Sequence, residues 1–333
     1  MAQGSIQDWK NSPAHLQLYS YFVKPETFYR FTEGYMSSDW RVVLKEPPAQ
    51  TLQMLIKDGY LIRPDLVTLI NYKFKLFDLK ELCRERHLPV SGKKTELVER
   101  LLTADKPGMQ IEVKDVELFV CSEKGKHLAD AYLETKERER EEAEKVVLDY
   151  LRQKKFLQAT RTVAKFEAKQ VFIRGMGIDW DEEYLTPNPH NISTLEILFD
   201  EIPTIAQGMD PEKLEYFRIV AGFFILWGDE ARGKRLLDGI ENVYDKFCNT
   251  EFVRMLWSYA NNKCDLREWR EMARVLDKKN YKVEIHTAND EYVCDNCKQL
   301  AKEKYPLLGD VPELPNPNCS HACRCVYALD FGF

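Results

Sequence analysis

Several features that identify enzymes and membrane proteins are absent from this chain of 333 residues. No apolar run reaches the roughly 18 residues that a membrane-spanning helix needs, and the longest, residues 220–227, fits a buried helix. The chain has no phosphate-binding loop, no dinucleotide-binding fingerprint and no nucleophile elbow. Only 15 glycines and 15 prolines accompany 44% hydrophobic residues, which excludes a mostly disordered protein. We expect a globular protein that is not an enzyme, has no membrane partner and shows no evident small-molecule substrate.

A chain of this length usually folds as two or more domains, and hydrophobic periodicity here favours helices in most of it. The predicted fold is mainly α and multi-domain. We expect four parts: an aromatic-rich segment at residues 1–48, a small α(+β) domain at 49–133, a helical domain at 134–280 and a cysteine-rich module at 281–333.

The first segment is rich in aromatic residues, among them Tyr19, Phe22 and Trp40. Because Lys24 and Arg30 are interleaved with the rings, one interpretation is stacking on single-stranded bases. Packing in a hydrophobic core is the commoner use of aromatic side chains, and it is the interpretation that we favour.

Residues 76–102 form the most distinctive pattern, because two short amphipathic helices flank a Pro-Val-Ser-Gly-Lys-Lys turn. Apolar residues recur at helical spacing in both halves: Leu76, Leu79, Leu82 and Cys83, then Leu97, Val98, Leu101 and Leu102. Pro89 is expected to end the first helix, and Ser91 or Gly92 to cap the second. The free backbone N–H groups of the second helix then lie beside Lys93 and Lys94, where they would attract phosphate.

This hairpin resembles the SAP motif, a helix-extended-helix DNA-binding hairpin. The residues that match its pattern are Leu76, Leu79, Lys80, Leu88, Gly92, Lys94, Leu97, Arg100 and Leu101. One departure is His87, where the family usually has glycine; histidine tolerates a left-handed backbone better than most residues. The resemblance implies binding to the DNA backbone, for which we predict Lys80, Arg84, Gly92, Lys93, Lys94 and Arg100.

The charge of the hairpin differs from that of the whole chain. Between residues 73 and 100, eight basic residues stand against five acidic ones, whereas the chain has a net charge of −6. Charge alone would fit two ordinary solvated surface helices, but the complete hairpin pattern favours nucleic-acid binding with a salt-dependent affinity.

The rest of the small domain leads into a charged helix. Alternating apolar residues at 111–120 predict strands, and Ser122 opens a helix, as in part of a winged-helix unit or an ordinary β-turn before a packing helix. Residues 134–145 are almost wholly charged, which predicts a solvated helix that separates two domains. Residues 146–280 then predict a helical bundle or an irregular solenoid without a fixed repeat.

A group of acidic residues at 179–183 surrounds Trp180. Such a group is able to bind a divalent ion for a nuclease, but no Lys or His that such a site recruits accompanies it. A solvent-facing loop is the interpretation that we favour.

Cysteines gather near the C-terminal end. Cys294 and Cys297 form a Cys-x₂-Cys pair, and a second cluster follows with Cys319, Cys323 and Cys325. This spacing predicts a structural Zn²⁺ site with four protein ligands. Disulfides and a redox Cys-x-x-Cys are the alternatives; the first ten residues have no apolar signal segment, so we expect a reduced, cytoplasmic protein.

Five thiols are available for four ligand positions. Cys294 and Cys297 are the firmest ligands, Cys319 with one of Cys323 and Cys325 completes the site, and His321 is held in reserve. Nothing in the sequence provides the open position and nearby base of a catalytic zinc.

The last 45 or so residues are similar to the C-terminal segment of phage head-morphogenesis proteins of the phage Mu protein F type. The shared pattern runs through Asp-x-x-Val-Cys-x-x-Cys at 290–297 and Cys-Arg-Cys at 323–325. The His-Pro step of that family is absent, and Cys319 with His321 stands near its place.

Two functions of different classes follow. The first is a DNA-binding adaptor in which the hairpin contacts phosphates, and the zinc module and helical domain stiffen the fold or position a protein partner. The second is a phage- or prophage-type assembly protein in which the zinc module docks to a larger particle and the hairpin is structural. Salt-dependent DNA binding separates them.

Overall fold

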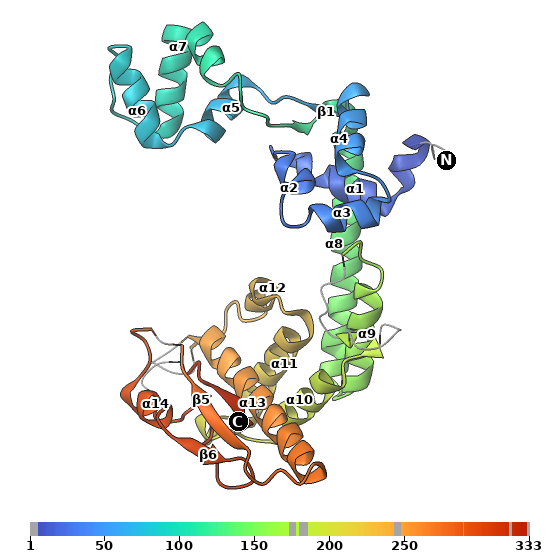
Figure 1. Ribbon diagram of the computed structural model, residues 1–333, viewed down its shortest axis with the longest axis vertical. Coiled ribbons are helices and arrows are strands. Elements are labelled where there is room, and N and C mark those ends of the chain that lie inside the picture. Colours follow the sequence, from blue (N-terminus) through green and yellow to red (C-terminus); the bar gives the residue numbers. More distant parts are fainter. Residues whose placement is uncertain are drawn as a thin grey trace. The chain divides into compact units, whose positions relative to one another are not determined.

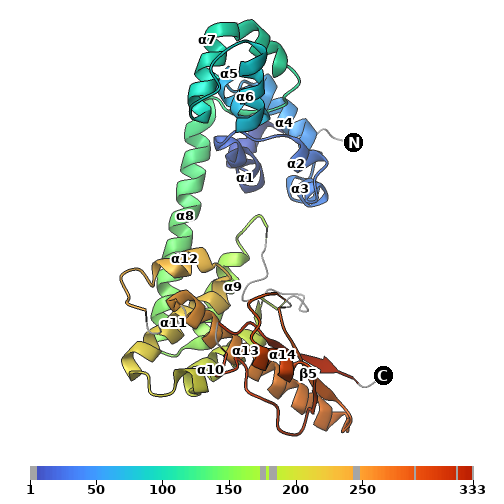
Figure 2. The ribbon, with the colours of Figure 1, turned by 90° about the vertical axis from the view of Figure 1, so that its left-hand side faces the viewer.

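The computed structural model describes residues 6–172, 178–179, 186–242, 248–288, 290–319 and 322–331. It is mainly helical and multi-domain, as predicted, and divides into two compact units, Met1–Glu139 and Arg140–Phe333. The boundary falls inside α8 (Glu123–Arg152), a single long helix that contains the predicted charged segment (Figures 1 and 2). Within the described ranges, no helix combines the length and apolar character that crossing a membrane requires.

The first unit begins with short helices around an aromatic core. These are η1 (Ile6–Asn11), α1 (Pro13–Ser20), η2 (Tyr21–Val23), α2 (Tyr29–Thr32), α3 (Ser37–Leu44) and α4 (Pro48–Lys57). Tyr19, Phe22 and Trp40 are buried, which confirms core packing for these rings. Tyr29 and Tyr35 differ from them, since 64% and 99% of their surfaces are exposed.

The hairpin is inserted between two strands that pair with each other. β1 (Leu61–Ile62) and β2 (Val120–Cys121) are antiparallel, and the chain between them forms α5 (Leu66–Lys73), α6 (Leu76–Glu85) and α7 (Lys94–Glu112) (Figure 1). Just beyond β1, the Arg63 guanidinium donates to the carbonyl oxygens of Val113 and Lys114, at 2.5 and 3.2 Å. The two ends of the inserted segment therefore lie side by side.

The three inserted helices share a core of their own. Its buried members include Ile70, Leu79, Leu82, Leu97, Leu101 and Met109. The burial of Leu76 was predicted wrongly, because its side chain is 42% exposed at the start of α6.

The predicted strands at 111–120 are wrong except at the end, where Phe119 forms an isolated β-bridge with Glu26 and Val120 belongs to β2. Helix α7 extends to Glu112 across a kink at Asp105, where φ is −151° and ψ is 63°. The Asp105 carboxylate accepts the Gly108 backbone N–H at 2.9 Å and restarts the helix, with Pro107 in the first turn, where its missing N–H is not needed.

The second unit contains a helical bundle. Besides the end of α8 it comprises α9 (Phe156–Glu167), α10 (Pro189–Asp200), η3 (Thr204–Ala206), α11 (Pro211–Trp227), α12 (Glu230–Arg235) and α13 (Asn249–Val275), with β3 (Ile178–Asp179) and β4 (Thr186–Pro187) as a short pair. Helices α10 and α11 pack against α13, and α11 is buried on nearly all sides. Helices make up most of the described residues in 146–280, as predicted, and Lys154, with φ of 54°, separates α8 from α9.

An antiparallel sheet completes this unit. Its strand order is β6 (Lys304–Pro306), β5 (Lys282–His286), β7 (Val326–Asp330), and α14 (Asp295–Leu300) lies between β5 and β6 in sequence. The register pairs Glu284 with Lys304 on one side and with Ala328 on the other. The buried face of the sheet shares a core with Met255 and Leu266 of α13. Of the predicted acidic loop, residues 180–185 lie outside the described residues.

Candidate functional site

The turn of the hairpin begins with a left-handed residue at the end of α6. His87 has φ of +53°, as predicted. Its backbone N–H donates to Arg84 O at 3.0 Å, and the next N–H, of Leu88, donates to Cys83 O at 2.8 Å. This is the pair of hydrogen bonds of a Schellman motif, in which glycine is the usual left-handed residue. Histidine fills the same role here without a change in geometry.

The start of α7 differs from the prediction. The N-cap is Lys93, not Ser91 or Gly92, and a Glu96 oxygen lies 3.3 Å from the Lys93 backbone nitrogen. Gly92 has φ of +120°, and a Cβ atom on it would collide with the Glu96 carboxylate. One negative charge therefore already occupies the helix N-terminus that was expected to attract phosphate.

The predicted phosphate-binding residues fall into two groups. Lys93 is exposed at the turn, and Lys80 and Arg84 lie one turn apart on α6, with Arg84 in an ion pair with Glu81. The other two basic residues, Lys94 and Arg100, make hydrogen bonds to backbone carbonyl groups of the inserted helices and turn.

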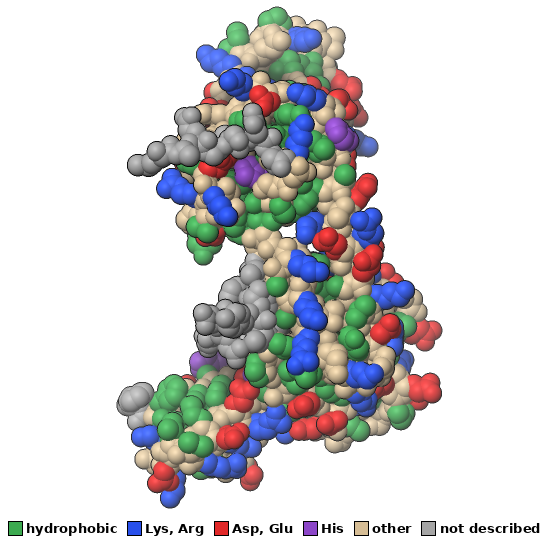
Figure 3. All heavy atoms as spheres, turned by 90° about the vertical axis from the view of Figure 1, so that its right-hand side faces the viewer, with side chains coloured by type: hydrophobic (Ala, Val, Ile, Leu, Met, Phe, Trp, Pro, Cys, Tyr) green, Lys and Arg blue, Asp and Glu red, His purple; other side chains and the backbone are tan. Residues whose placement is uncertain are grey.

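Lys94 and Arg100 each donate to backbone carbonyls of the hairpin. Lys94 Nζ donates to Asn71 O at the end of α5, at 2.7 Å. The Arg100 guanidinium donates to Pro89 O and, at 3.1 Å, to Ser91 O, so it spans the extended turn. These contacts fix the turn that presents Lys93. On the face of the molecule drawn in Figure 3, Lys and Arg side chains outside the hairpin are interspersed with Asp and Glu side chains.

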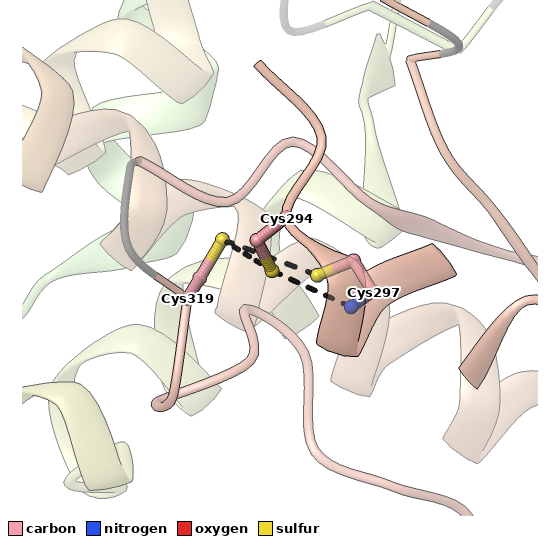
Figure 4. Close-up of side chains that lie close together, drawn as sticks. All are labelled: Cys294, Cys297 and Cys319. Carbon is pink, nitrogen blue, oxygen red and sulfur yellow. Dashed lines mark hydrogen bonds between the residues drawn. The ribbon is translucent and has the colours of Figure 1, made fainter. Parts of the chain in front are cut away.

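The cysteines come together at the start of α14 and in the loop before β7. Cys294 is the N-cap of α14, Cys297 lies one turn into this helix, and Cys319 approaches from the loop (Figure 4). Cys323 and Cys325, just before β7, complete the group. All nine cysteines lie within the described residues, and none of them forms a disulfide.

Three pairs of sulfurs are about as far apart as ligands of a tetrahedral ion, and they belong to two overlapping groups that share Cys297: Cys294, Cys297 and Cys319, then Cys297, Cys323 and Cys325. Four sulfurs at about 2.3 Å from a Zn²⁺ ion lie about 3.8 Å from one another. The observed Sγ–Sγ distances are 3.3 Å for Cys294–Cys319, 4.0 Å for Cys297–Cys319 and 3.8 Å for Cys297–Cys323. Cys325 groups with Cys297 and Cys323. The cysteine cluster is therefore able to hold a metal ion, and His321 lies outside the described residues.

The surroundings of the sulfurs favour a closed site. The gap among them is about 10 Å³, room for a single water or ion. The Asn316 amide donates to Cys297 Sγ at 3.8 Å. A hydrogen bond with the Cys325 thiol lowers the pKa of Cys323 to about 6, whereas burial raises the pKa of Cys297. Adjacent thiolates repel one another, so these thiols do not all ionise together in the absence of a cation. A bound cation would stabilise them as thiolates.

Sequence reasoning missed a second group with metal-binding chemistry. His190 of α10 meets Cys264 and Glu268 of α13. The only sequence signal is the spacing of four residues between Cys264 and Glu268, which puts both on one face of a helix. Nothing in the sequence indicates which distant histidine joins them.

The hairpin is the part of the chain that matches a known protein family. Residues 73–106 match the family model of the SAP domain, from the end of α5 to the kink in α7. This match supports nucleic-acid binding by this part of the chain. No curated protein and no solved structure matches the chain. The similarity of the last 45 or so residues to phage head-morphogenesis proteins has no support from these comparisons and stays a prediction.

Proposed function

We propose that this protein is a DNA-binding adaptor in which the inserted hairpin contacts backbone phosphates and a zinc module stiffens the second unit. The observation that supports it most is the match of residues 73–106 to the SAP domain, together with an exposed Lys93 at the turn of the hairpin. Contacts to phosphates position a protein on DNA and give little sequence preference.

In this proposal the basic residues have two roles, direct contact with phosphates and stabilisation of the turn. Lys93, Lys80 and Arg84 have side chains that reach solvent, and they contact phosphates directly. Lys94 and Arg100 hold the turn through Asn71, Pro89 and Ser91, and their positive charges add to the attraction for phosphates. Gly92 lets the backbone approach a phosphate, because it carries no side chain at the tip of the turn.

In the second unit, we propose that Cys294, Cys297, Cys319 and Cys323 bind a structural Zn²⁺ ion. Contacts of 3.3 to 4.0 Å connect these four sulfurs in a chain, and Cys325 supports Cys323 by a hydrogen bond. The ion would tie the loop before β7 to α14. A stiffened sheet of this kind offers a protein partner a fixed surface.

The test is a fluorescence-anisotropy titration of the full chain with single- and double-stranded DNA at two salt concentrations. With about four phosphate contacts, affinity should fall roughly 100-fold between about 50 and 200 mM salt. A Lys93→Ala/Lys94→Ala variant should bind more weakly and show a salt slope smaller by about 2. Lys57→Ala, which removes a charge from the exposed end of α4, is the matched control and should bind like the wild type.

Absence of binding to either form of DNA, or binding that the double substitution leaves unchanged, would contradict the phosphate-clamp role of the hairpin. The zinc content of the same samples tests the cysteine cluster separately.

A further inference from the structure

Three side chains of different chemistry meet at the contact of α10 with α13. His190 Nδ1 lies 3.2 Å from Glu268 Oε1, and Cys264 Sγ lies 3.4 Å from the same oxygen and 3.7 Å from His190 Nδ1. The three ligand atoms thus form a nearly equilateral triangle. Neither DNA binding by the hairpin nor the cysteine cluster explains this arrangement.

The triangle has the size of one face of a zinc tetrahedron. Zinc lies about 2.0–2.2 Å from nitrogen and oxygen ligands and about 2.3 Å from sulfur, so two of its ligand atoms are about 3.3–3.6 Å apart. The observed separations of 3.2, 3.4 and 3.7 Å fall close to this range. An ion above the triangle would contact all three atoms without movement of either helix.

The hydrogen bonds around His190 orient its ring for such an ion. The Asn261 amide group donates to Asp265 Oδ2 at 3.1 Å, which turns Asn261 Oδ1 towards His190 Nε2 at 3.2 Å. Because this oxygen accepts only, Nε2 carries a hydrogen, and a neutral ring would therefore offer the lone pair of Nδ1 to an ion. Histidine ligands of metals commonly donate their second N–H in this way.

Burial differs among the three groups. Cys264 is fully buried, whereas the side chains of His190 and Glu268 are 31% and 49% exposed. An ion can therefore reach His190 and Glu268 from solvent, and water would complete its coordination. The site differs in this respect from the closed cysteine cluster.

We propose that His190 Nδ1, Cys264 Sγ and Glu268 Oε1 bind a second Zn²⁺ ion, with Asn261 as a positioning residue. The inference does not depend on nucleic-acid binding. Its rival is a protonated His190 paired with Glu268, in which no metal takes part. The zinc site and the ion pair predict different metal contents for the full chain. They also predict different results for a substitution of Asn261, which is not a ligand and would affect zinc binding only through the orientation of His190.

The experiment is to load the purified full chain with Zn²⁺, remove the excess and measure bound zinc by mass spectrometry. The Cys264→Ala and Glu268→Gln variants should each hold one ion fewer per chain than the wild type. Glu271→Gln, an exposed change on the same helix, should hold as much as the wild type. Asn261→Ala should keep the ligands but lose zinc to a competing chelator about 10–100-fold more readily.

Folding and the other cluster are controlled separately. Circular dichroism checks each variant, and Glu268→Gln tests the site even if Cys264→Ala misfolds, because Glu268 lies at the surface. A Cys294→Ser variant removes the ion of the cysteine cluster, so a combined Cys294→Ser/Glu268→Gln protein should lose both. Zinc content that Glu268→Gln leaves at the wild-type level would overturn the proposal.

Discussion

The carboxylate of Glu96 lies 3.3 Å from the backbone nitrogen of Lys93, at the N-terminus of the helix that follows the hairpin turn. A negative charge is favourable at this end of a helix, and it competes there with a phosphate for the same positive end. We therefore expect Glu96→Gln to bind DNA about 2- to 5-fold more tightly, which corresponds to the ~0.3–1 kcal/mol of a charge at a helix end.

Glutamine still accepts the Lys93 N–H, so the helix start should remain intact in this variant. Glu99→Gln makes the same charge change one turn later on α7, where the side chain is exposed, and should have a smaller effect. Anisotropy titrations of the three proteins at one salt concentration measure the difference. Equal affinities for Glu96→Gln and the wild type would argue against phosphate binding at this helix end.

Substitution of Gly92 should destabilise the hairpin. An alanine there would have to adopt φ of +120° and would collide with Glu96, so Gly92→Ala should cost about 1–3 kcal/mol of local stability. Gly59→Ala is the control, because Gly59 has φ of +73° but open space around it, and it should cost about 1 kcal/mol. Amide hydrogen exchange within residues 76–102 reports the first change, and similar exchange in Gly92→Ala and the wild type would contradict it.

The ion pair of Arg86 with Asp105 makes the hairpin sensitive to acid. The Arg86 Nε–Asp105 Oδ2 distance is 2.8 Å, and this hydrogen bond holds the pKa of Asp105 below its ordinary value of 3.8. The stabilisation is therefore present above pH 3.8 and is lost as the pH falls through the lowered pKa. In Asp105→Asn, where the amide oxygen still accepts the Gly108 N–H, this part of the acid destabilisation should disappear.

Calorimetric unfolding of the first unit between about pH 5 and pH 2 measures this pH dependence. Asp58→Asn removes an exposed carboxylate of the same unit outside the hairpin and should keep the wild-type profile. An unchanged slope in Asp105→Asn would show that the ion pair with Arg86 does not couple to folding.

Removal of metal from the cysteine cluster should loosen the C-terminal sheet. We expect Cys294→Ser to lose one Zn²⁺ per chain and to expose the amides of β5 and β7 to faster hydrogen exchange, because the proposed ion would connect α14 to the loop before β7. Cys248→Ser changes an exposed thiol of the same unit and should keep both its zinc and its protection. Faster exchange in both variants alike would point to a cause other than the metal.

The hairpin was predictable because its information is local. The helical spacing of Leu79 and Leu82, the left-handed position at His87 and the glycine of the turn all lie within residues 76–102. The start of α7 was not predictable from cap preferences, which favour serine or glycine over lysine. At this helix start, the residue at the N-cap does not provide the capping side chain. Instead, the Glu96 carboxylate accepts the backbone N–H of Lys93.

The strands expected at 111–120 failed for a related reason. The alternation of Ile111 and Val113 indicates a strand, but the buried pair is Met109 and Val113, four residues apart, and Ile111 is 65% exposed. Spacing of four residues is the helical period. A Pro107 that begins a helical turn cannot be told from one that ends a helix until the capping carboxylate of Asp105 is located.

The two candidate metal sites show the same contrast. The cysteine cluster is concentrated in 32 residues with recognisable spacing, so its ligand types were evident from the sequence. The site of His190 and Cys264 joins residues that are 74 positions apart, and only the packing of α10 on α13 brings them together. Long-range packing of this kind leaves no short motif.

Because β1 pairs with β2, the segment between these strands is an insertion whose two ends lie side by side. Leu61 and Ile62 lie opposite Cys121 and Val120, and Phe119 stacks on Phe28 with ring centroids 4.2 Å apart, so the scaffold on either side of the insertion is already closed. A short turn could replace everything between Ile62 and Phe119 and leave the aromatic core untouched.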